Sequence, residues 1–363
     1  MLENPPASMK SAGKTTWVLA APGAGDNHQL RALASLVSDD IRWFEAFDGV
    51  PRVLIDRLRP GAAKTMQADK KERFSPPWPN LVLIAGGRSV IDALRIRHAS
   101  HGHSRIVCIG RPWAPLGWFD LVVTTPQYQL PESDSVLCLP LPLNLPDAET
   151  DAEHPVILSE WLDLPRPWLG VLLGGDSGSY QFTQNAAISI ADQLNSYTRS
   201  TGGSALVISS PRTPGAALTA LESQLQPAGV VHRWQAPQQP SLLPAVLQHA
   251  DSLWVTSDSA SMLAEAIYSA KQVSLLELPR RLRSRLLRWM RKRALPGKTI
   301  KQKLVERGLW LPARDLNLLH ERLRHQGLLS DLNHAAQPEL NKVNQQLQQD
   351  HEKLRRRISR LFE

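Results

Sequence analysis

The feature that most constrains this 363-residue chain is the alternation of short apolar runs with helical stretches, which begins near Thr16 and continues to Leu276. Runs rich in Val, Ile and Leu are typical of buried strands, and their alternation with helices is typical of parallel sheets with crossover helices. The expected strands of the first series are 16–22, 41–47, 81–85, 105–109, 121–125 and 135–139, and those of the second are 168–173, 204–210, 230–234, 253–256 and 273–276. The sequence therefore predicts an α/β fold with two sheets.

Length and a linker divide the chain into parts. Because 363 residues exceed the size at which one core stops growing, we expect two domains of about 150 residues each. The stretch 140–167 is rich in proline and acids and has no regular period, which is typical of a linker. The predicted parts are a disordered leader 1–14, an N-terminal domain 15–145, a linker 146–167, a C-terminal domain 168–330 with a basic helix at 279–295, and a C-terminal helix 331–363.

The positive charge of the chain is concentrated in one segment. Residues 280–293 hold eight Arg and Lys side chains and no acid, and the rest of the chain holds 34 basic and 34 acidic residues. A neutral chain with one basic segment argues against a broad nucleic-acid-binding face.

Apolar residues recur at helical spacing within the basic segment, which predicts a cationic amphipathic helix suited to an anionic membrane surface. The residues expected to contact the membrane are Arg281, Arg285, Arg288, Trp289 and Lys292. Docking of a partner protein, an acidic-acceptor site and RNA binding are the alternatives.

Cysteine usage indicates the compartment. Cys108 and Cys138 each lie in an apolar strand-like run, so we expect buried thiols in a reducing, cytoplasmic environment. No Cys/His cluster has the spacing of metal ligands, so no metal is expected. The N-terminus has no apolar signal-peptide core, and no apolar run reaches the roughly 18 residues that span a bilayer. The sequence predicts a cytoplasmic protein that lies at most peripherally on the inner membrane.

A strand–turn–helix–strand unit at 252–278 carries the main candidate binding site. Its turn, Ser257 to Ser261, is rich in hydroxyl and carboxylate side chains that cap a helix start, where backbone N–H groups favour a phosphate. Glu265 follows Ser261 by one helical turn and is placed to accept hydrogen bonds from sugar hydroxyls. The alternative is that these residues only cap a helix.

Two further strand ends of the second series carry Gly, Ser, Thr or Arg. Gly174-Gly175 follows strand 168–173, and Arg212-Thr213 follows strand 204–210. Because the ends of parallel strands meet at one sheet edge, these loops and the 257–261 turn are expected to meet one anionic ligand, with Arg212 binding phosphate bidentately. The predicted nucleotide-sugar site comprises Gly174, Gly175, Ser177, Ser209, Arg212, Thr213, Ser257, Asp258, Ser259, Ser261, Met262 and Glu265.

The first series has two glycine-rich strand ends of its own. A turn from Gly23 to Gln29 follows the first strand, and Gly86-Gly87 follows strand 81–85. Ligands bind at such ends in α/β folds, although the full dinucleotide fingerprint is absent and simple tight turns are the alternative. The residues expected on this side are Gly23, Gly25, Asn27, Gln29, Gly86, Gly87 and Arg88.

These motifs together resemble the GT-B glycosyltransferase architecture and, more narrowly, the elongated-mitochondria family of a plant mitochondrial fission factor and its bacterial relatives. The motifs that carry the resemblance are Gly25 to Leu30, Ala85 to Arg88, Leu173 to Gly175, Ser209 to Pro214, and Thr256 to Ser259 with Ser261, Met262 and Glu265. The resemblance covers residues 16–278. It implies two Rossmann-like domains that face each other across a cleft, with the acceptor on the N-terminal side and Glu265 near the ribose of a nucleoside-diphosphate sugar.

Two function classes follow from the sequence. The first is a glycosyltransferase that acts at or near the inner membrane surface, takes a nucleotide-sugar donor and an unknown acceptor, and needs no further cofactor because helix dipoles and Arg212 hold the diphosphate. No catalytic residue is assigned. The second is a non-catalytic, membrane-peripheral interaction factor. The amphipathic tail from Pro338 is expected to pack on the body or to form a coiled coil that joins subunits.

Overall fold

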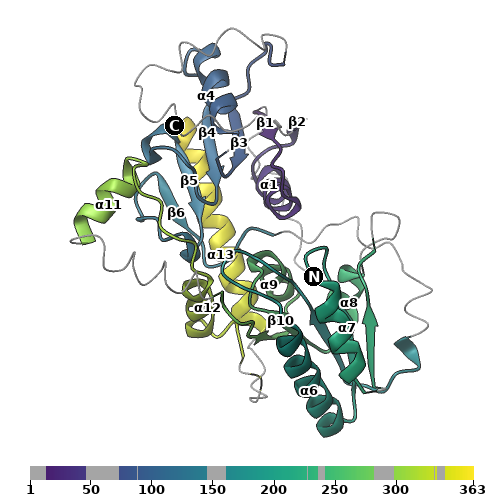
Figure 1. The fold of residues 1–363 in the computed structure, drawn as a ribbon. Coiled ribbons are helices and arrows are strands. Elements are labelled where there is room, and N and C mark those ends of the chain that lie inside the picture. Colours follow the sequence, from purple (N-terminus) through teal and green to yellow (C-terminus); the bar gives the residue numbers. More distant parts are fainter. Residues whose placement is uncertain are drawn as a thin grey trace. The chain divides into compact units, whose positions relative to one another are not determined.

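The structure, a computed structural model, divides the chain into two compact units (Figure 1). It describes residues 14–45, 73–87, 89–144, 161–226, 228–235, 242–281, 298–330, 332 and 340–363. Unit 1 comprises 1–143, 295–315 and 346–363, and unit 2 comprises 144–294 and 316–345.

Unit 1 is built on a six-stranded sheet with the order β2-β1-β3-β4-β5-β6, in which every pair of neighbours is parallel. The strands are β1 (Thr15–Leu19), β2 (Asp40–Phe44), β3 (Leu81–Ala85), β4 (Arg105–Ile109), β5 (Leu121–Thr124) and β6 (Val136–Cys138). The chain places β2 on one side of β1 and β3 on the other. The order of connection therefore reverses between β1 and β3, and such switch points are where α/β folds bind ligands.

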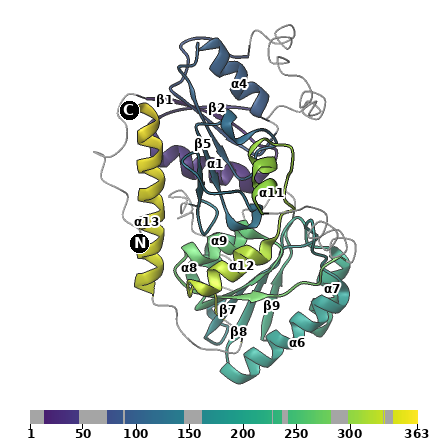
Figure 2. The same cartoon turned by 90° about the vertical axis from the view of Figure 1, so that its left-hand side faces the viewer.

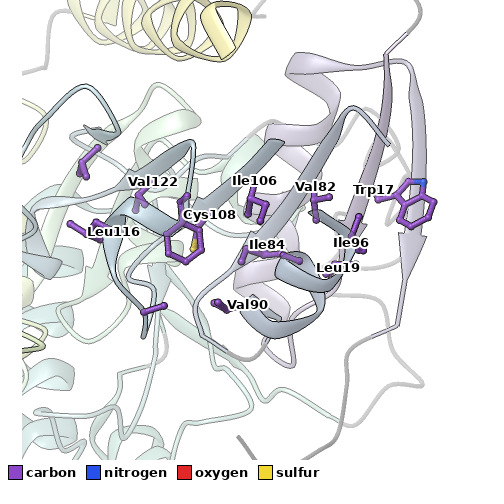
Figure 3. Close-up of a cluster of buried hydrophobic side chains, with 14 of the residues drawn as sticks. Trp17, Leu19, Val82, Ile84, Val90, Ile96, Ile106, Cys108, Leu116 and Val122 are labelled. Carbon is purple, nitrogen blue, oxygen red and sulfur yellow. The ribbon is translucent and has the colours of Figure 1, made fainter. Parts of the chain in front are cut away.

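Helices α1 (Ala24–Val37) and α4 (Val90–Ala99) follow β1 and β3. Apolar side chains of the strands gather with Val90 and Ile96 of α4 in the core of unit 1 (Figure 3). β3 is buried at all five positions, as expected for a strand that is covered on both faces. Cys108 is fully buried in the same core, as predicted, and burial raises the pKa of its thiol, whereas Cys138 at the end of β6 was also expected to be buried and is only half-buried.

Unit 2 is built on a five-stranded parallel sheet with the order β11-β10-β7-β8-β9. The strands are β7 (Trp168–Leu172), β8 (Ser204–Ile208), β9 (Gly229–His232), β10 (Ser252–Thr256) and β11 (Gln272–Leu276). The helices are α6 (Gln184–Thr201), α7 (Gly215–Gln224), α8 (Leu243–His249) and α9 (Ala260–Tyr268), of which α6 and α7 lie side by side (Figure 2). The switch point of this sheet lies between β7 and β10, so the ends of β10, β7 and β8 are neighbours.

The C-terminal part contributes to both units. Val305 of α11 (Lys298–Glu306) lies in the apolar core of unit 1, and residues 309–315 continue in that unit. α12 (Leu316–His325) belongs to unit 2, where Ser330 pairs with Ser274 of β11. Most of α13 (Leu340–Ser359) belongs to unit 1, with Leu347, Leu354 and Ile358 buried.

The strands and helices match the predicted α/β class with two Rossmann-like units, but three expectations differ from the structure. Trp161 was expected in the linker, whereas it is fully buried against Trp168 and His232 in unit 2. Residues 298–315 were expected within the C-terminal domain, whereas they belong to unit 1, where Val305 packs in the core. A turn was expected from Gly23 to Gln29, whereas α1 begins at Ala24, so Gly25, Asn27 and Gln29 lie within the helix.

Candidate functional site

The ends of β7 and β10 are joined by hydrogen bonds at the switch point of unit 2, and we call the bonded residues Gly174, Gly175, Thr256 and Asp258 the interlock. The backbone N–H of Gly174 donates to Thr256 Oγ1 (2.7 Å), and that of Gly175 donates to Asp258 Oδ2 (3.0 Å). Thr256 Oγ1 also donates to Asp258 Oδ1 (2.7 Å). Asp258 is only 1% exposed, so its carboxylate accepts hydrogen bonds inside the protein and does not face solvent.

The loop after β8 joins the same interlock. Arg212 Nη1 lies 2.9 Å from Asp258 Oδ2, while 41% of the Arg212 side chain stays exposed. Thr213 Oγ1 donates to Leu173 O (3.1 Å), and Ser210 Oγ donates to Gly174 O (3.1 Å). One carboxylate therefore ties the ends of three neighbouring strands together, which is the convergence that the sequence predicted.

Both glycines after β7 are required by this packing. A Cβ on Gly174 would lie 2.2 Å from Asp258 Oδ1, and a Cβ on Gly175 would lie 1.9 Å from the carbonyl oxygen of Arg212. Close approach of the loops explains these two residues without a ligand. Their predicted contact with phosphate stays a prediction.

The start of α9 lies directly beside the interlock. Ser259 Oγ accepts from Met262 N (3.4 Å) as the helix cap, and buried Ser257 Oγ accepts from Leu278 N (2.9 Å). The backbone N–H groups of Ala260 and Ser261 have no acceptor among the described residues. Ser261, Met262 and Glu265 are half-buried at this end, so the helix start can offer two N–H groups to an anion.

Two other residues of the predicted site lie at the margins of the interlock. Ser209 Oγ accepts from Trp234 N (2.7 Å), which ties it to the chain beyond β9. Ser177 pairs through its backbone with Tyr180 in the loop after β7. Ser209 therefore bonds to the β9 side of β8, whereas Asp258 lies on the β7 side.

The first residues of the basic segment are fastened to the loop after β7. Arg281 Nη2 lies 2.8 Å from Asp176 Oδ2, and Arg281 N donates to Ser179 O (2.9 Å). Arg285, Arg288, Trp289 and Lys292 lie outside the described residues, so the membrane contact stays a prediction.

The carboxyl edge of unit 1 is built differently. Asn27 Oδ1 accepts from Ala21 N (2.7 Å), and Asn27 Nδ2 donates to Ala21 O (2.8 Å), so its amide holds the end of β1 against α1. Gly23 is the N-cap, and Gln29 Nε2 donates to Gly25 O (3.3 Å). Asn27 thus has a structural partner at the end of β1, and Gln29 has one within its own helix turn.

The end of β3 in unit 1 carries the second glycine pair. Gly86 has a φ of +67°, which favours glycine, and a Cβ on Gly87 would lie 2.8 Å from the ring of Trp113. Trp113 is 41% exposed, so an aromatic face lies at this edge. Arg88 lies outside the described residues.

Sequence reasoning missed a charged cluster at the same edge of unit 1. Arg111 Cζ lies 5.7 Å and Arg314 Cζ lies 6.0 Å from the centroid of the Tyr128 ring. The Asp26 side chain is exposed but partly desolvated by the surrounding chain, which raises the pKa of its carboxyl group, and the charge of Arg314 lowers that pKa in part. We call Asp26, Arg111, Tyr128 and Arg314 the Tyr128 cluster. Arg111 follows strand β4 directly and could have been found as a strand-end residue, whereas Arg314 comes from a distant segment with no local signal.

Within the described part of the chain, no group of three or more His, Cys, Asp and Glu side chains is placed to hold a metal. The helices described there include none with the length and apolar character needed to cross a membrane.

The chain is therefore an α/β protein of two Rossmann-like units, as in GT-B-like proteins, with interlocked strand ends at the switch point of its second sheet. Residues 24–298 match the family model described as Mitochondrial fission ELM1, and the chain belongs to this family. None of the curated proteins matches the chain.

Several solved structures are similar in fold. UDP-N-acetylglucosamine 2-epimerase from Rickettsia bellii is 10% identical, with 95% of this chain and 96% of that chain covered and a TM-score of 0.44. Arabidopsis thaliana UGT89C1 complexed with UDP-L-rhamnose is 13% identical, with 94% and 99% covered and a TM-score of 0.43. An S. aureus MnaA–UDP co-structure is 10% identical, with 86% and 95% covered and a TM-score of 0.43.

Proposed function

We propose that unit 2 binds the diphosphate of a nucleoside-diphosphate sugar at the start of α9, and that the chain is a glycosyltransferase. The observation that carries the proposal is the convergence of three strand ends on Asp258 at the switch point of the sheet. Ligands of open α/β sheets bind at this place, outside the carboxyl ends of the strands.

The local chemistry suits an anion with an attached sugar. The N–H groups of Ala260 and Ser261 add partial positive charge, and the exposed N–H groups of Arg212, whose charge is paired with Asp258, can still donate to a phosphate. Asp258 is already neutralised by Arg212 and by its hydrogen bonds, so it does not repel a phosphate as an exposed carboxylate would. Glu265 is half-buried one turn further along α9, where a carboxylate can accept from ribose hydroxyls.

The substitution that tests this site must leave the interlock intact. Replacing Arg212 would unpair a buried carboxylate and lower stability, so a loss of binding would be ambiguous. Glu265→Gln keeps the size of the side chain, removes its charge and replaces one acceptor oxygen by an NH2 donor. Asp192→Asn on α6 is the matched control, because it removes one exposed acid of the same unit.

The experiment is a thermal-shift screen of the full chain against UDP, GDP, CMP and ADP sugars, followed by calorimetric titration of each variant with the sugar that gives the largest shift. At a ligand concentration of 100 Kd we expect about 2.7 kcal/mol of added stability. Glu265→Gln should weaken binding about tenfold or more, and Asp192→Asn should not change it. If no nucleotide sugar raises the melting temperature, the proposal is wrong.

A further inference from the structure

The Tyr128 cluster sits on a segment that the chain fastens firmly. Gln129 Nε2 donates to Ala313 O (2.8 Å), Asp315 N donates to Gln127 O (2.9 Å), and Arg111 donates to Pro312 O. These bonds hold residues 312–315 to the carboxyl ends of β4 and β5. The backbone of Arg314 is therefore fixed at the edge of the unit 1 sheet although its side chain is exposed.

Asp26 and Arg314 carry opposite charges but do not form an ion pair. Arg314 is near enough to Asp26 to lower the pKa of that carboxyl group, yet no nitrogen–oxygen pair of the two residues lies within 4.0 Å. Both side chains are exposed, and among the described residues the Asp26 carboxylate accepts no hydrogen bond. Because the two side chains do not pair with each other, both can form hydrogen bonds with a ligand at this edge.

A buried acceptor in the same anchoring segment adds an independent sign of function. Gln127 is 2% exposed, and its Oε1 has no hydrogen-bond partner among the described residues. A buried oxygen without a donor costs about 1–3 kcal/mol, so this group calls for a partner from outside the described side chains. The exposed Trp113 ring at the end of β3 supplies an apolar face to the same sheet edge.

We propose that the Tyr128 cluster is a ligand site that takes a small hydroxylated molecule with one anionic group, a phosphate or a carboxylate. Arg314 binds the anionic group through its planar N–H donors, and Asp26 accepts a hydrogen bond from a hydroxyl of the same molecule. A bare anion would be repelled by Asp26, and a neutral sugar would leave Arg314 unused. That this ligand is the acceptor rests on the proposed function, whereas the site itself does not.

The test uses the full chain and three simple probes in ligand-detected NMR titrations. Glycerol 3-phosphate and glycerate carry hydroxyls with a phosphate or a carboxylate, and glycerol lacks the charge. We expect binding of at least one anionic probe, with a preference between the two that identifies the source of the charge, and no measurable binding of glycerol. Arg314→Ala should weaken the binding at least about tenfold.

Matched variants separate recognition from folding. Arg307→Ala removes another exposed arginine of the same unit and should leave the affinity unchanged. Asp26→Asn should weaken the binding of glycerol 3-phosphate, because the acceptor for its hydroxyl is lost. The same variant should strengthen the binding of methyl phosphate, which has no alcohol hydroxyl, because the repulsion between Asp26 and the anion is lost. A purely structural effect would weaken the binding of both probes.

Equal affinity in Arg314→Ala and Arg307→Ala would overturn the proposal, and so would failure of the wild-type chain to bind either anionic probe. The outcome is independent of the donor site. If the probes behave as expected while no nucleotide sugar binds, the proposed function fails and the anion site stands.

Discussion

Asp258 at the carboxyl edge of unit 2 is buried and bonded to three strand ends, whereas Asp26 at the corresponding edge of unit 1 is exposed and its carboxylate accepts no hydrogen bond among the described residues. The arginines differ in the same way. Arg212 is paired with its acid at 2.9 Å, whereas Arg314 stays outside ion-pair distance of Asp26.

Two parallel sheets of similar topology can therefore carry two kinds of site at their carboxyl edges. In unit 2 the charges are used to fix the loops, so a ligand meets backbone N–H groups at a rigid edge. In unit 1 the amide of Asn27 fixes the end of β1, which leaves the charged side chains for the surface. Substitutions should therefore affect mainly stability at the unit 2 interlock and mainly recognition at the Tyr128 cluster.

The largest effect is expected from Gly175→Ala. The new Cβ would lie 1.9 Å from the backbone oxygen of Arg212, which cannot move as a side chain can. We expect a loss of about 3 kcal/mol or more in the free energy of unfolding, measured by urea denaturation. Gly215→Ala is the control, because no atom lies within 4 Å of its Cβ position. Equal stability of the two variants would mean that the strand ends of unit 2 are not interlocked.

Asp258→Asn is expected to cost about 2–3 kcal/mol of unfolding free energy. The neutral amide cannot replace the charge opposite Arg212, and its NH2 group would face donors that now meet an oxygen. Asp26→Asn in unit 1 should change stability by less than about 0.5 kcal/mol. Similar losses in both variants would remove the contrast between the two edges.

Acid should weaken unit 1 through His351 on α13. Burial, with the charge of Arg355, lowers the pKa of His351 from 6.5 to about 4 in the folded chain. Between these pH values the unfolded chain binds a proton that the folded chain does not, so stability falls as the pH drops from 6.5 to 4. We expect a loss of about 2 kcal/mol in wild type that is absent in His351→Gln, measured as the pH dependence of urea unfolding. Parallel pH profiles would contradict the buried, neutral histidine.

The smallest effect is expected from Asn27→Ala, which removes two hydrogen bonds to Ala21 and should cost about 1 kcal/mol. His28→Ala in the same helix turn is the control, since its side chain is half-buried but forms no hydrogen bond or ion pair among the described residues. Asn27→Ala should leave nucleotide-sugar binding in unit 2 unchanged. A loss of stability above that of Asp258→Asn would show that the edge of unit 1 is the more tightly bonded of the two.

The sequence predicted the elements of both sheets and the meeting of three strand ends in unit 2, because parallel strands bring their carboxyl ends to one edge wherever glycines and hydroxyls follow them. It did not predict that Asp258 would be buried, since a capping carboxylate and an interlocking one have the same local pattern. No pattern in the sequence marks Arg314 as a residue of a site. Pro312 beside it meets Arg111 across 201 residues of sequence, and this return is specified by burial of Val305 in unit 1 and not by any local motif. The helix start at Ala24 was missed because glycines predict a turn, while the Asn27 amide stabilises a helix there.

The most direct test of the donor site is the amide NMR spectrum of the full chain titrated with UDP, GDP, CDP and ADP in turn. We predict that one of these diphosphates shifts the amide resonances of Ala260, Ser261 and the loop after β7, and that Glu265→Gln weakens this response while Asp192→Asn does not. Shifts confined to other parts of the chain, or no shift with any of the four, would contradict the account.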